Sequence, residues 1–403
     1  MRFAVTLLLI VGGLAAAAHA AAGAPMRIDD FGDNPGNLEM WVYSPTQAPA
    51  NAPLVVVLHG CTQQATSMAP GGFEDLADEL GFHILYPQQK TANNPIGCFN
   101  WAGEYGDPAN LVRGEGENQS IVSMVESMVA SRSIDHDRIF VIGFSAGGGF
   151  AAVLLATWPD LFAAGAVAAG VPYRCATDQQ SAFDCMNLAT HPDRKKAPRA
   201  WGDLVRAAYP QWDGPWPRVL ILQGTADTTV QPDAADELVE QWTNVHGIGL
   251  EPDQMDQIAG HRRARYLARG AVAVESWRIE GMGHAFPIGR ADPDHGCGQA
   301  AAYFEDRDLC GAYRALEFFG LAGEVDDPSG SADAGPGHGD DGDGTASDEG
   351  GGGCRAADND AASARGYVPL LLLLAAAMRI ARRRRAGRST LPAPVRGSSG
   401  TNS

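Results

Sequence analysis

The residues of this chain with the clearest chemical potential surround Ser145, the centre of the pentapeptide Gly-Phe-Ser-Ala-Gly at positions 143–147. A short apolar run rich in β-branched residues precedes the pentapeptide, and an apolar, alanine-rich stretch with helical spacing follows it. This order is typical of a nucleophile elbow, in which a tight strand-to-helix turn exposes a serine hydroxyl above a sheet. Ser145 is therefore predicted to be a nucleophile.

A serine nucleophile needs an acid that orients its base, and Asp227 is the best candidate for that acid. In folds with a nucleophile elbow the chain order is serine, then acid, then histidine. After Ser145, Asp227 is the first acid to follow an apolar strand, here at 219–223. Asp233 and Asp236 are weaker candidates because they fall on the helix that is predicted next.

The base is predicted to be His284. It follows an apolar strand and ends the sequence Gly-Met-Gly-His at 281–284, where two glycines let the loop bend the imidazole back over the sheet edge. His261 lies in an arginine-rich stretch and His295 in a polar loop, so both are weaker candidates. His284 completes the predicted catalytic triad.

Acyl transfer through such a triad also needs two backbone amides that stabilise the negatively charged oxygen of the tetrahedral intermediate. One is expected from Ala146, at the start of the elbow helix. The other is expected from the loop His-Gly-Cys-Thr at 59–62, where the Cys61 amide is preferred and the Thr62 amide is the alternative. His59 precedes the serine in the chain, so it is expected to position this loop.

Strands and helices alternate along the chain in the pattern of an α/β protein. Continuous apolar runs predict buried strands, and apolar residues at helical spacing predict the helices between them. The predicted strands are 54–58, 82–86, 138–142, 162–169, 219–223 and 272–279, and the predicted helices are 73–80, 121–129 and 233–245. This alternation predicts a mostly parallel sheet with helices on both faces, and 38–43 is expected to add an antiparallel edge.

The stretch 175–217 breaks the alternation and is predicted to be an insertion over the carboxyl edge of the sheet, where ligands bind in such folds. Its aromatic residues include Trp201, Trp212 and Trp216. We expect these three side chains to bind substrate, because flat apolar rings can hold an apolar chain or another ring. The alternative is that they pack the insertion onto the sheet.

The beginning of the chain predicts secretion. Residues 1–20 read as a signal peptide, because Arg2 precedes a short apolar run that ends in the small-residue cleavage site Ala-His-Ala. The folded domain is expected to span 21–323, which is long enough for one large core.

The end of the chain is predicted to carry a linker and a sorting segment. Residues 324–353 are acidic and rich in glycine, which predicts a disordered linker. Residues 354–388 combine Cys354, a short apolar run and an arginine cluster, which predicts a sorting or anchor segment, and 389–403 form a tail. A plain tail anchor is the alternative. The formal net charge of −18 argues against a nucleic-acid partner.

Six cysteines lie within the predicted domain and indicate disulfides in a secreted chain. Their order suggests the pairs Cys61–Cys98, Cys175–Cys185 and Cys297–Cys310. A zinc site is not favoured, because no two of these cysteines have the close spacing that such sites use.

The chain resembles the poly(3-hydroxybutyrate) depolymerase family of secreted esterases, which is related to feruloyl and acetylxylan esterases. The matching stretches are 58–63, 97–101, 113–117, 143–148, 172–173, 224–230, 241–242 and 281–284. The resemblance implies the same triad and supports the Cys61–Cys98 pair. Trp101, within one matching stretch, joins the expected substrate-binding residues.

These observations predict a secreted serine esterase with an α/β-hydrolase fold that needs no metal or cofactor. The expected substrate is poly(3-hydroxybutyrate) or a related hydroxyalkanoate polyester or oligomer. A feruloyl or acetylxylan esterase is the alternative enzyme, and a non-catalytic surface-binding protein on an esterase scaffold is the alternative outside enzymes. The membrane is expected to be a partner only through the C-terminal segment, which would tether the protein to the outer surface.

Polymer-degrading members of the family often carry a separate substrate-binding domain. In this chain the residues after 323 are predicted to be linker and tag instead. Amorphous polyester, oligomers and plant cell-wall esters are therefore the substrates left open.

Overall fold

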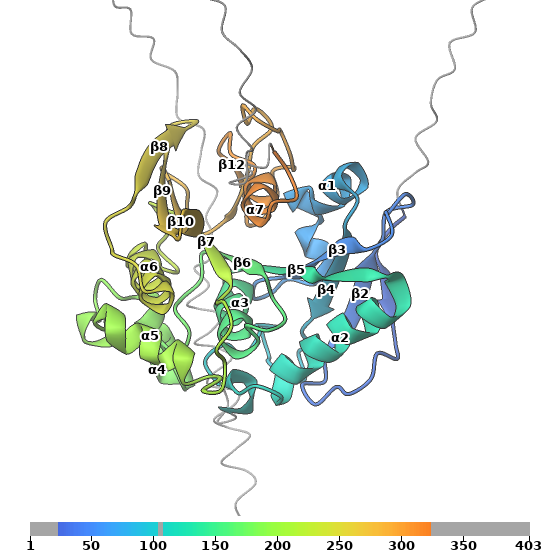
Figure 1. Ribbon diagram of the computed structural model, residues 1–403, viewed down its shortest axis with the longest axis horizontal. Helices are drawn as coiled ribbons and strands as arrows, with labels where there is room; N and C mark the ends of the chain where they lie inside the picture. The colour runs from blue at the N-terminus through green and yellow to red at the C-terminus, as the bar shows by residue number, and fades with distance from the viewer. Residues whose placement is uncertain (1–22, 104–107, 324–403) are drawn as a thin grey trace, which may run out of the picture.

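In the computed structural model, which describes residues 23–103 and 108–323, ten strands form one sheet (Figure 1). They are β1 (Met26–Ile28), β2 (Glu39–Tyr43), β3 (Ala52–Leu58), β4 (His83–Gln88), β5 (Ile134–Phe144), β6 (Ala164–Ala168), β7 (Arg218–Gly224), β8 (Gln254–Ile258), β9 (His261–Ala268) and β10 (Ala271–Ile279). Their order in the sheet is β1-β2-β4-β3-β5-β6-β7-β10-β9-β8. The strands from β4 to β10 in this order run parallel, which confirms the predicted mostly parallel sheet.

Helices cover both faces of the sheet. They are α1 (Phe73–Leu80), α2 (Gly116–Arg132), α3 (Ala146–Thr157), α4 (Gln179–Met186), α5 (Pro198–Arg206), α6 (Asp233–His246) and α7 (Gly311–Phe319). Figure 1 shows α1 and α7 on one face and α2, α3 and α6 on the other, with α4 and α5 on the same side as α6. Two further short strands, β11 (Phe286–Ile288) and β12 (Phe304–Asp306), pair with each other near α7.

The apolar central strands build a core on each face of the sheet. Every residue of β3 is buried. Leu54, Val56 and Leu58 join the core on the side of α2 and α3, whereas Val55 and Val57 join the core on the side of α1 and α7. Successive side chains of a strand point to opposite faces, so an uninterrupted apolar run supplies both cores at once.

The structure differs from the predicted sheet at both ends. β2 pairs antiparallel with β4 as expected, but β1 lies outside β2 and forms the edge. At the other end, β8 and β9 form an unpredicted hairpin that adds two antiparallel strands beside β10. No residue of β8 is buried. An unburied strand does not need apolar residues, and the sequence of β8 has no apolar run from which a strand could be predicted.

The predicted insertion at 175–217 does not lie over the active edge as one unit. Only its first part, with α4, reaches the carboxyl edge, where α4 lines a pocket together with Ser145. α5 packs along α6 instead. The residues after α5 lead back to the opposite, amino edge of the sheet, where β7 begins at Arg218.

The three predicted disulfides are present, joining Cys61 to Cys98, Cys175 to Cys185 and Cys297 to Cys310. Within the described ranges, no helix combines the length and the apolar character needed to cross a bilayer. The predicted signal peptide (1–20), linker (324–353), sorting segment (354–388) and tail (389–403) lie outside the residues that the structure describes.

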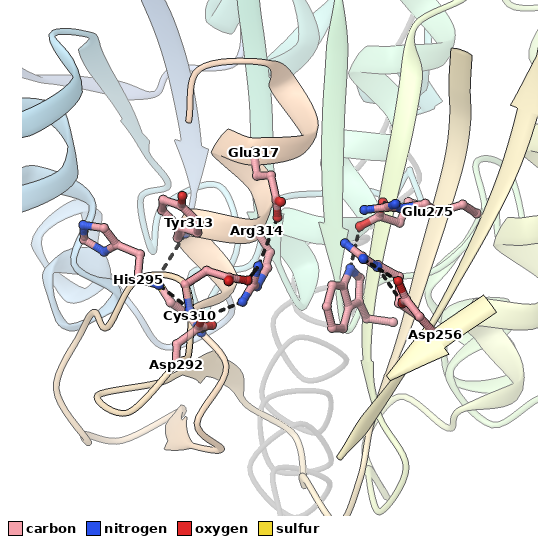
Figure 2. Close-up of polar contacts among 12 residues, drawn as sticks. Asp256, Glu275, Asp292, His295, Cys310, Tyr313, Arg314 and Glu317 are labelled. Carbon is pink, nitrogen blue, oxygen red and sulfur yellow. Dashed lines mark hydrogen bonds and ion pairs between the residues drawn. The ribbon is translucent and has the colours of Figure 1, made fainter. Parts of the chain in front are cut away.

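A buried arginine fastens α7 to the loop that follows β11 (Figure 2). Arg314 is 1% exposed and pairs with Asp292 at 2.5 Å and with Asp294 at 2.6 Å, and Glu317 of its own helix lies at 3.1 Å. Asp292 also accepts the backbone amide of Cys310 at 2.8 Å. A buried cation needs such partners, and here they anchor the disulfide-closed loop that contains β12.

Candidate active site

Ser145 occupies a strained turn between β5 and α3. Its backbone has φ 57° and ψ −118°, a conformation that residues with a side chain rarely adopt. A Cβ atom on Gly143 would lie 2.0 Å from the carbonyl oxygen of Gly147, and one on Gly147 would lie 2.3 Å from the carbonyl oxygen of Leu58. Only glycine fits at both positions, so the local sequence accounts for the turn that presents the serine hydroxyl.

The three predicted triad residues form one chain of hydrogen bonds. The hydroxyl of Ser145 lies 2.9 Å from Nε2 of His284, and Nδ1 of His284 lies 2.8 Å from Oδ2 of Asp227. The three residues follow β5, β10 and β7, whose carboxyl ends meet at one edge of the parallel sheet. With the Nδ1 proton held by the carboxylate, Nε2 is free to accept the serine proton.

Asp227 is fixed by donors on both carboxylate oxygens, and its side chain is fully buried. Oδ1 accepts the amides of Thr229 at 2.8 Å and Val230 at 3.0 Å, while Oδ2 lies 3.3 Å from Nε2 of Gln223. Sequence reasoning did not identify Gln223. The available signal was a glutamine inside an otherwise apolar strand, because buried glutamine is uncommon.

The loop that carries His284 rests on β7 and is tied to β12. A Cβ atom on Gly224 would lie 2.3 Å from the carbonyl oxygen of Met282, so only glycine lets the loop approach this closely. The amide of Gly283 donates to Oε2 of Glu305 at 3.1 Å. Sequence reasoning did not identify Glu305 either, since no spacing in the sequence connects it with the histidine.

Two backbone amides beside the serine have no acceptor in the described part of the chain. These belong to Cys61 and Ala146, and both residues line the pocket next to Ser145. The Thr62 amide, the alternative considered from sequence, donates to the carbonyl oxygen of Ile96 at 2.7 Å and is therefore occupied. The Ala146 amide opens α3, where first-turn N–H groups attract negative charge.

His59 is buried and holds the loop that contains Cys61. Its Nε2 accepts the amide of Gln89 at 3.1 Å, so the ring proton is on Nδ1, which lies 2.7 Å from the carbonyl oxygen of Gly60. Burial lowers the pKa of His59 to about 4, which keeps the ring neutral near pH 7. That carbonyl and the Cys61 amide belong to one planar peptide unit, so the bond from His59 also orients the amide.

A mainly apolar pocket opens beside Ser145. Its lining includes Ile96, Trp101, Val171 and Val230, together with side chains of α4. Trp101 is the one predicted substrate-binding tryptophan that lines this pocket. Its indole packs on α3 at Gly149, where a Cβ atom would lie 2.9 Å from the ring.

The comparisons with known proteins identify the family. Residues 38–265 match the family described as esterase PHB depolymerase. The chain belongs to this family. It is 44% identical over 298 residues to poly(3-hydroxyalkanoate) depolymerase C of Paucimonas lemoignei, covering 74% of this chain and 70% of the relative. It is 36% identical over 271 residues to feruloyl esterase B of Thermothelomyces thermophilus, covering 66% of this chain and 90% of the relative.

The solved structure of acetyl xylan esterase from Aspergillus awamori is also similar. The TM-score is 0.61 at 26% sequence identity, and the match covers 74% of this chain and 100% of that one. The α/β-hydrolase fold is thereby confirmed, and the protein is a serine esterase that hydrolyses carboxylic ester bonds. The alternative of a non-catalytic binding protein is wrong.

Trp201 of the esterase lies in the core rather than at the site. Its side chain is 0% exposed, and its Nε1 donates to Oε2 of Glu237 on α6 at 2.6 Å. α5 turns its apolar face toward α6, and Trp201 is on that face. A fully buried indole cannot touch a substrate, so the structure corrects the prediction for Trp201.

Trp212 of the esterase lies at the far end of α3. Its ring stacks on Tyr209, and the Arg113 guanidinium lies 4.1 Å from the Tyr209 ring and 3.6 Å from the Trp158 ring. Trp158 directly follows α3, whereas Ser145 directly precedes it. A helix of twelve residues is about 18 Å long, so Trp212 is far from the nucleophile.

Trp216 is placed similarly, just before β7 begins at the amino edge of the sheet. It is partly buried against the core on the α3 face. The seven residues of β7 span roughly 20 Å from that edge to the edge where Asp227 lies. The structure therefore corrects the predictions for both Trp212 and Trp216, because the chain after α5 returns to the amino edge.

Replacing Trp101 with alanine is expected to lower kcat/KM of the esterase for p-nitrophenyl butyrate roughly tenfold or more, because a wall of the pocket is lost. The matched change, Trp212→Ala, is expected to leave kcat/KM within about twofold. Initial rates are measured below the unfolding temperature of each variant. Equal losses in the two variants would show that Trp101 has no particular part in substrate binding.

Proposed function

We propose that Ser145, His284 and Asp227 are the catalytic triad of this serine esterase, and that the amides of Cys61 and Ala146 form its oxyanion hole. The observation that carries the proposal is the unbroken hydrogen-bond chain, with separations of 2.9 Å and 2.8 Å, from the serine of a strained elbow to a buried aspartate. The amides of Cys61 and Ala146, which have no acceptor among the residues that the structure describes, support the second part.

The proposed reaction follows from these positions. Nε2 of His284 takes the proton of Ser145 as Oγ attacks the ester carbonyl carbon, and the oxyanion accepts hydrogen bonds from the two amides. The imidazolium, stabilised by Asp227, returns the proton to the leaving oxygen. The alcohol departs and an acyl-enzyme remains. Water then attacks the acyl carbon with His284 again as base, which frees the carboxylic acid.

The proposed substrate is a poly(3-hydroxyalkanoate), such as poly(3-hydroxybutyrate), or its oligomers. The 44% identity with a poly(3-hydroxyalkanoate) depolymerase supports this choice. The mainly apolar pocket beside Ser145 also suits an aliphatic chain. The second candidate is a feruloyl or acetylxylan esterase, favoured by the 36% identity with a feruloyl esterase and by the similarity to the acetyl xylan esterase structure.

The two substrate classes are separated by the products that the enzyme releases. Amorphous poly(3-hydroxybutyrate), acetylated xylan and feruloylated arabinoxylan are incubated with equal amounts of enzyme, and soluble products are measured by chromatography. We expect 3-hydroxybutyrate and its oligomers to form at least about tenfold faster than acetate or ferulate, a difference of about 1.4 kcal/mol in the barrier. Release of acetate or ferulate without polyester products would favour the carbohydrate esterase.

The proposed location is extracellular, after removal of residues 1–20, with tethering through 354–388. Support comes from the three disulfides, which persist in oxidising compartments. Mass spectrometry of protein recovered from the cell surface and from the medium tests this. A mature chain that retains residues 1–20 would contradict the signal peptide, and a chain found only free in the medium would contradict tethering.

A further inference from the structure

The pocket beside Ser145 has a defined orientation relative to the reacting ester. His284 returns its proton to the leaving oxygen, so the leaving alcohol must lie next to the imidazole. The pocket is lined by Ser145 and by both residues of the proposed oxyanion hole, Cys61 and Ala146, but His284 is not part of its lining. On the proposed mechanism, the pocket therefore receives the acyl part of the ester.

One face of α4 forms a wall of this acyl pocket. Gln179, Ala182, Phe183 and Met186 all line it, and their spacing of three, four and seven residues places them on one side of a helix. The helix is held in place by its Asp178 cap, which accepts the Ser181 amide at 2.9 Å, and by the Cys175–Cys185 disulfide. A two-turn helix fixed at both ends gives this wall a defined shape.

The wall is apolar except at Gln179. Asn94, the other amide side chain in the lining, is already bonded to Asn100 and to the amide of Ile96. The Gln179 side chain has no hydrogen-bond partner among the residues that the structure describes. Within that lining, Gln179 is thus the amide available to a substrate atom.

We propose that α4 selects the acyl group, with Gln179 forming a hydrogen bond to an oxygen carried by the acyl chain and with Ala182, Phe183 and Met186 enclosing its carbon atoms. This inference rests on the proposed function. The acyl class that fits one polar contact in an apolar wall is a short 3-hydroxyalkanoyl group, which has an oxygen within an otherwise aliphatic chain. A plain fatty acyl group offers Gln179 no hydrogen-bond partner, so it gains nothing from this contact.

The test compares p-nitrophenyl esters of butyrate and 3-hydroxybutyrate, so that the leaving group is constant. We expect Gln179→Leu to lower the ratio of kcat/KM for 3-hydroxybutyrate to that for butyrate by about 3- to 10-fold, the range of one neutral hydrogen bond. The matched control is Gln180→Leu, since Gln180 lies on the same helix but is exposed. It should leave the ratio within about twofold.

A filling variant tests the shape of the wall. Ala182→Leu is expected to lower kcat/KM for butyrate relative to acetate by roughly tenfold, because added methyl groups occupy the space of the longer chain. An unchanged ester ratio in Gln179→Leu, or equal losses for acetate and butyrate in Ala182→Leu, would overturn the inference. A loss confined to p-nitrophenyl ferulate in Gln179→Leu would also overturn it.

These outcomes are distinct from failure of the proposed function. If the wild-type protein hydrolyses none of the esters, or if Ser145→Ala hydrolyses them equally well, the proposed triad fails whatever the α4 variants do. If hydrolysis depends on Ser145 and the α4 variants keep the wild-type ratios, only the acyl-selection proposal fails. Circular dichroism and thermal unfolding of each variant confirm that α4 remains folded.

Discussion

Replacing Ser145 with alanine is expected to lower kcat for a p-nitrophenyl ester by roughly 10³-fold or more, as loss of a triad nucleophile does. Without Oγ no acyl-enzyme can form, and His284 has no hydroxyl to deprotonate. The oxyanion amides and the pocket remain, so substrate binding should change far less than turnover. Pre-steady-state kinetics should also lose any burst of p-nitrophenol that reports acylation.

The control for Ser145→Ala is Ser131→Ala. Ser131 is exposed on α2. Its hydroxyl donates to the carbonyl oxygen of Ser127 at 2.7 Å and accepts from Arg132 at 3.1 Å, and both partners lie on the same helix. Its loss should leave kcat within about twofold. Intact mass spectrometry and thermal unfolding establish that both variants are pure and folded. Near-normal turnover in folded Ser145→Ala would remove this serine from the mechanism.

The central sheet could be predicted because a strand that is buried on both faces has a continuous run of apolar residues in its sequence. Strands such as β3 are apolar at every position. A short apolar run of this kind between two turns is typical of a strand that is buried on both faces. The first strand of the β8–β9 hairpin has no such apolar run. β8 is exposed except at Ile258, which is partly buried, and its pairing depends on backbone hydrogen bonds that nearly any sequence can form.

The triad positions could be predicted because chain order and sheet topology constrain them together. An acid and a histidine that follow parallel strands necessarily reach the same edge as the elbow serine. The positions of the tryptophans carried no such constraint. Composition indicates an aromatic insertion but not the direction in which its chain runs, and here the chain returns to the amino edge after α5.

The side chains that support the triad were harder to predict from the sequence than the triad itself. Gln223 lies four residues before Asp227, but nothing in the sequence shows that the chain after β7 turns back so that the two side chains meet, and Glu305 contacts Gly283 across 22 residues. Only folding brings them to Asp227 and to the loop of His284. The wall formed by α4 was missed for a similar reason, because eight residues give two helical turns, too few to separate a buried face from chance.

Replacing Asp227 with asparagine is expected to lower kcat/KM by roughly 10⁴-fold, through the wrong tautomer of His284 rather than through lost folding. Oδ1 of Asp227 accepts two backbone amides, from Thr229 and Val230, so the asparagine oxygen should remain there. Its NH₂ group then faces the imidazole and donates to Nδ1. The ring proton moves to Nε2, which can no longer accept the proton of Ser145.

The matched control is Asp233→Asn, which makes the same chemical change on α6. Asp233 pairs with Lys195 at 2.6 Å and is one-third exposed, and it was a weaker candidate for the acid. Its replacement should leave kcat/KM within about twofold. Nuclear magnetic resonance of the His284 ring nitrogens reports the tautomer directly. If Asp227→Asn lost activity with the proton still on Nδ1, the tautomer argument would fail, and if Asp233→Asn caused the larger loss, the acid would have to be reassigned to α6.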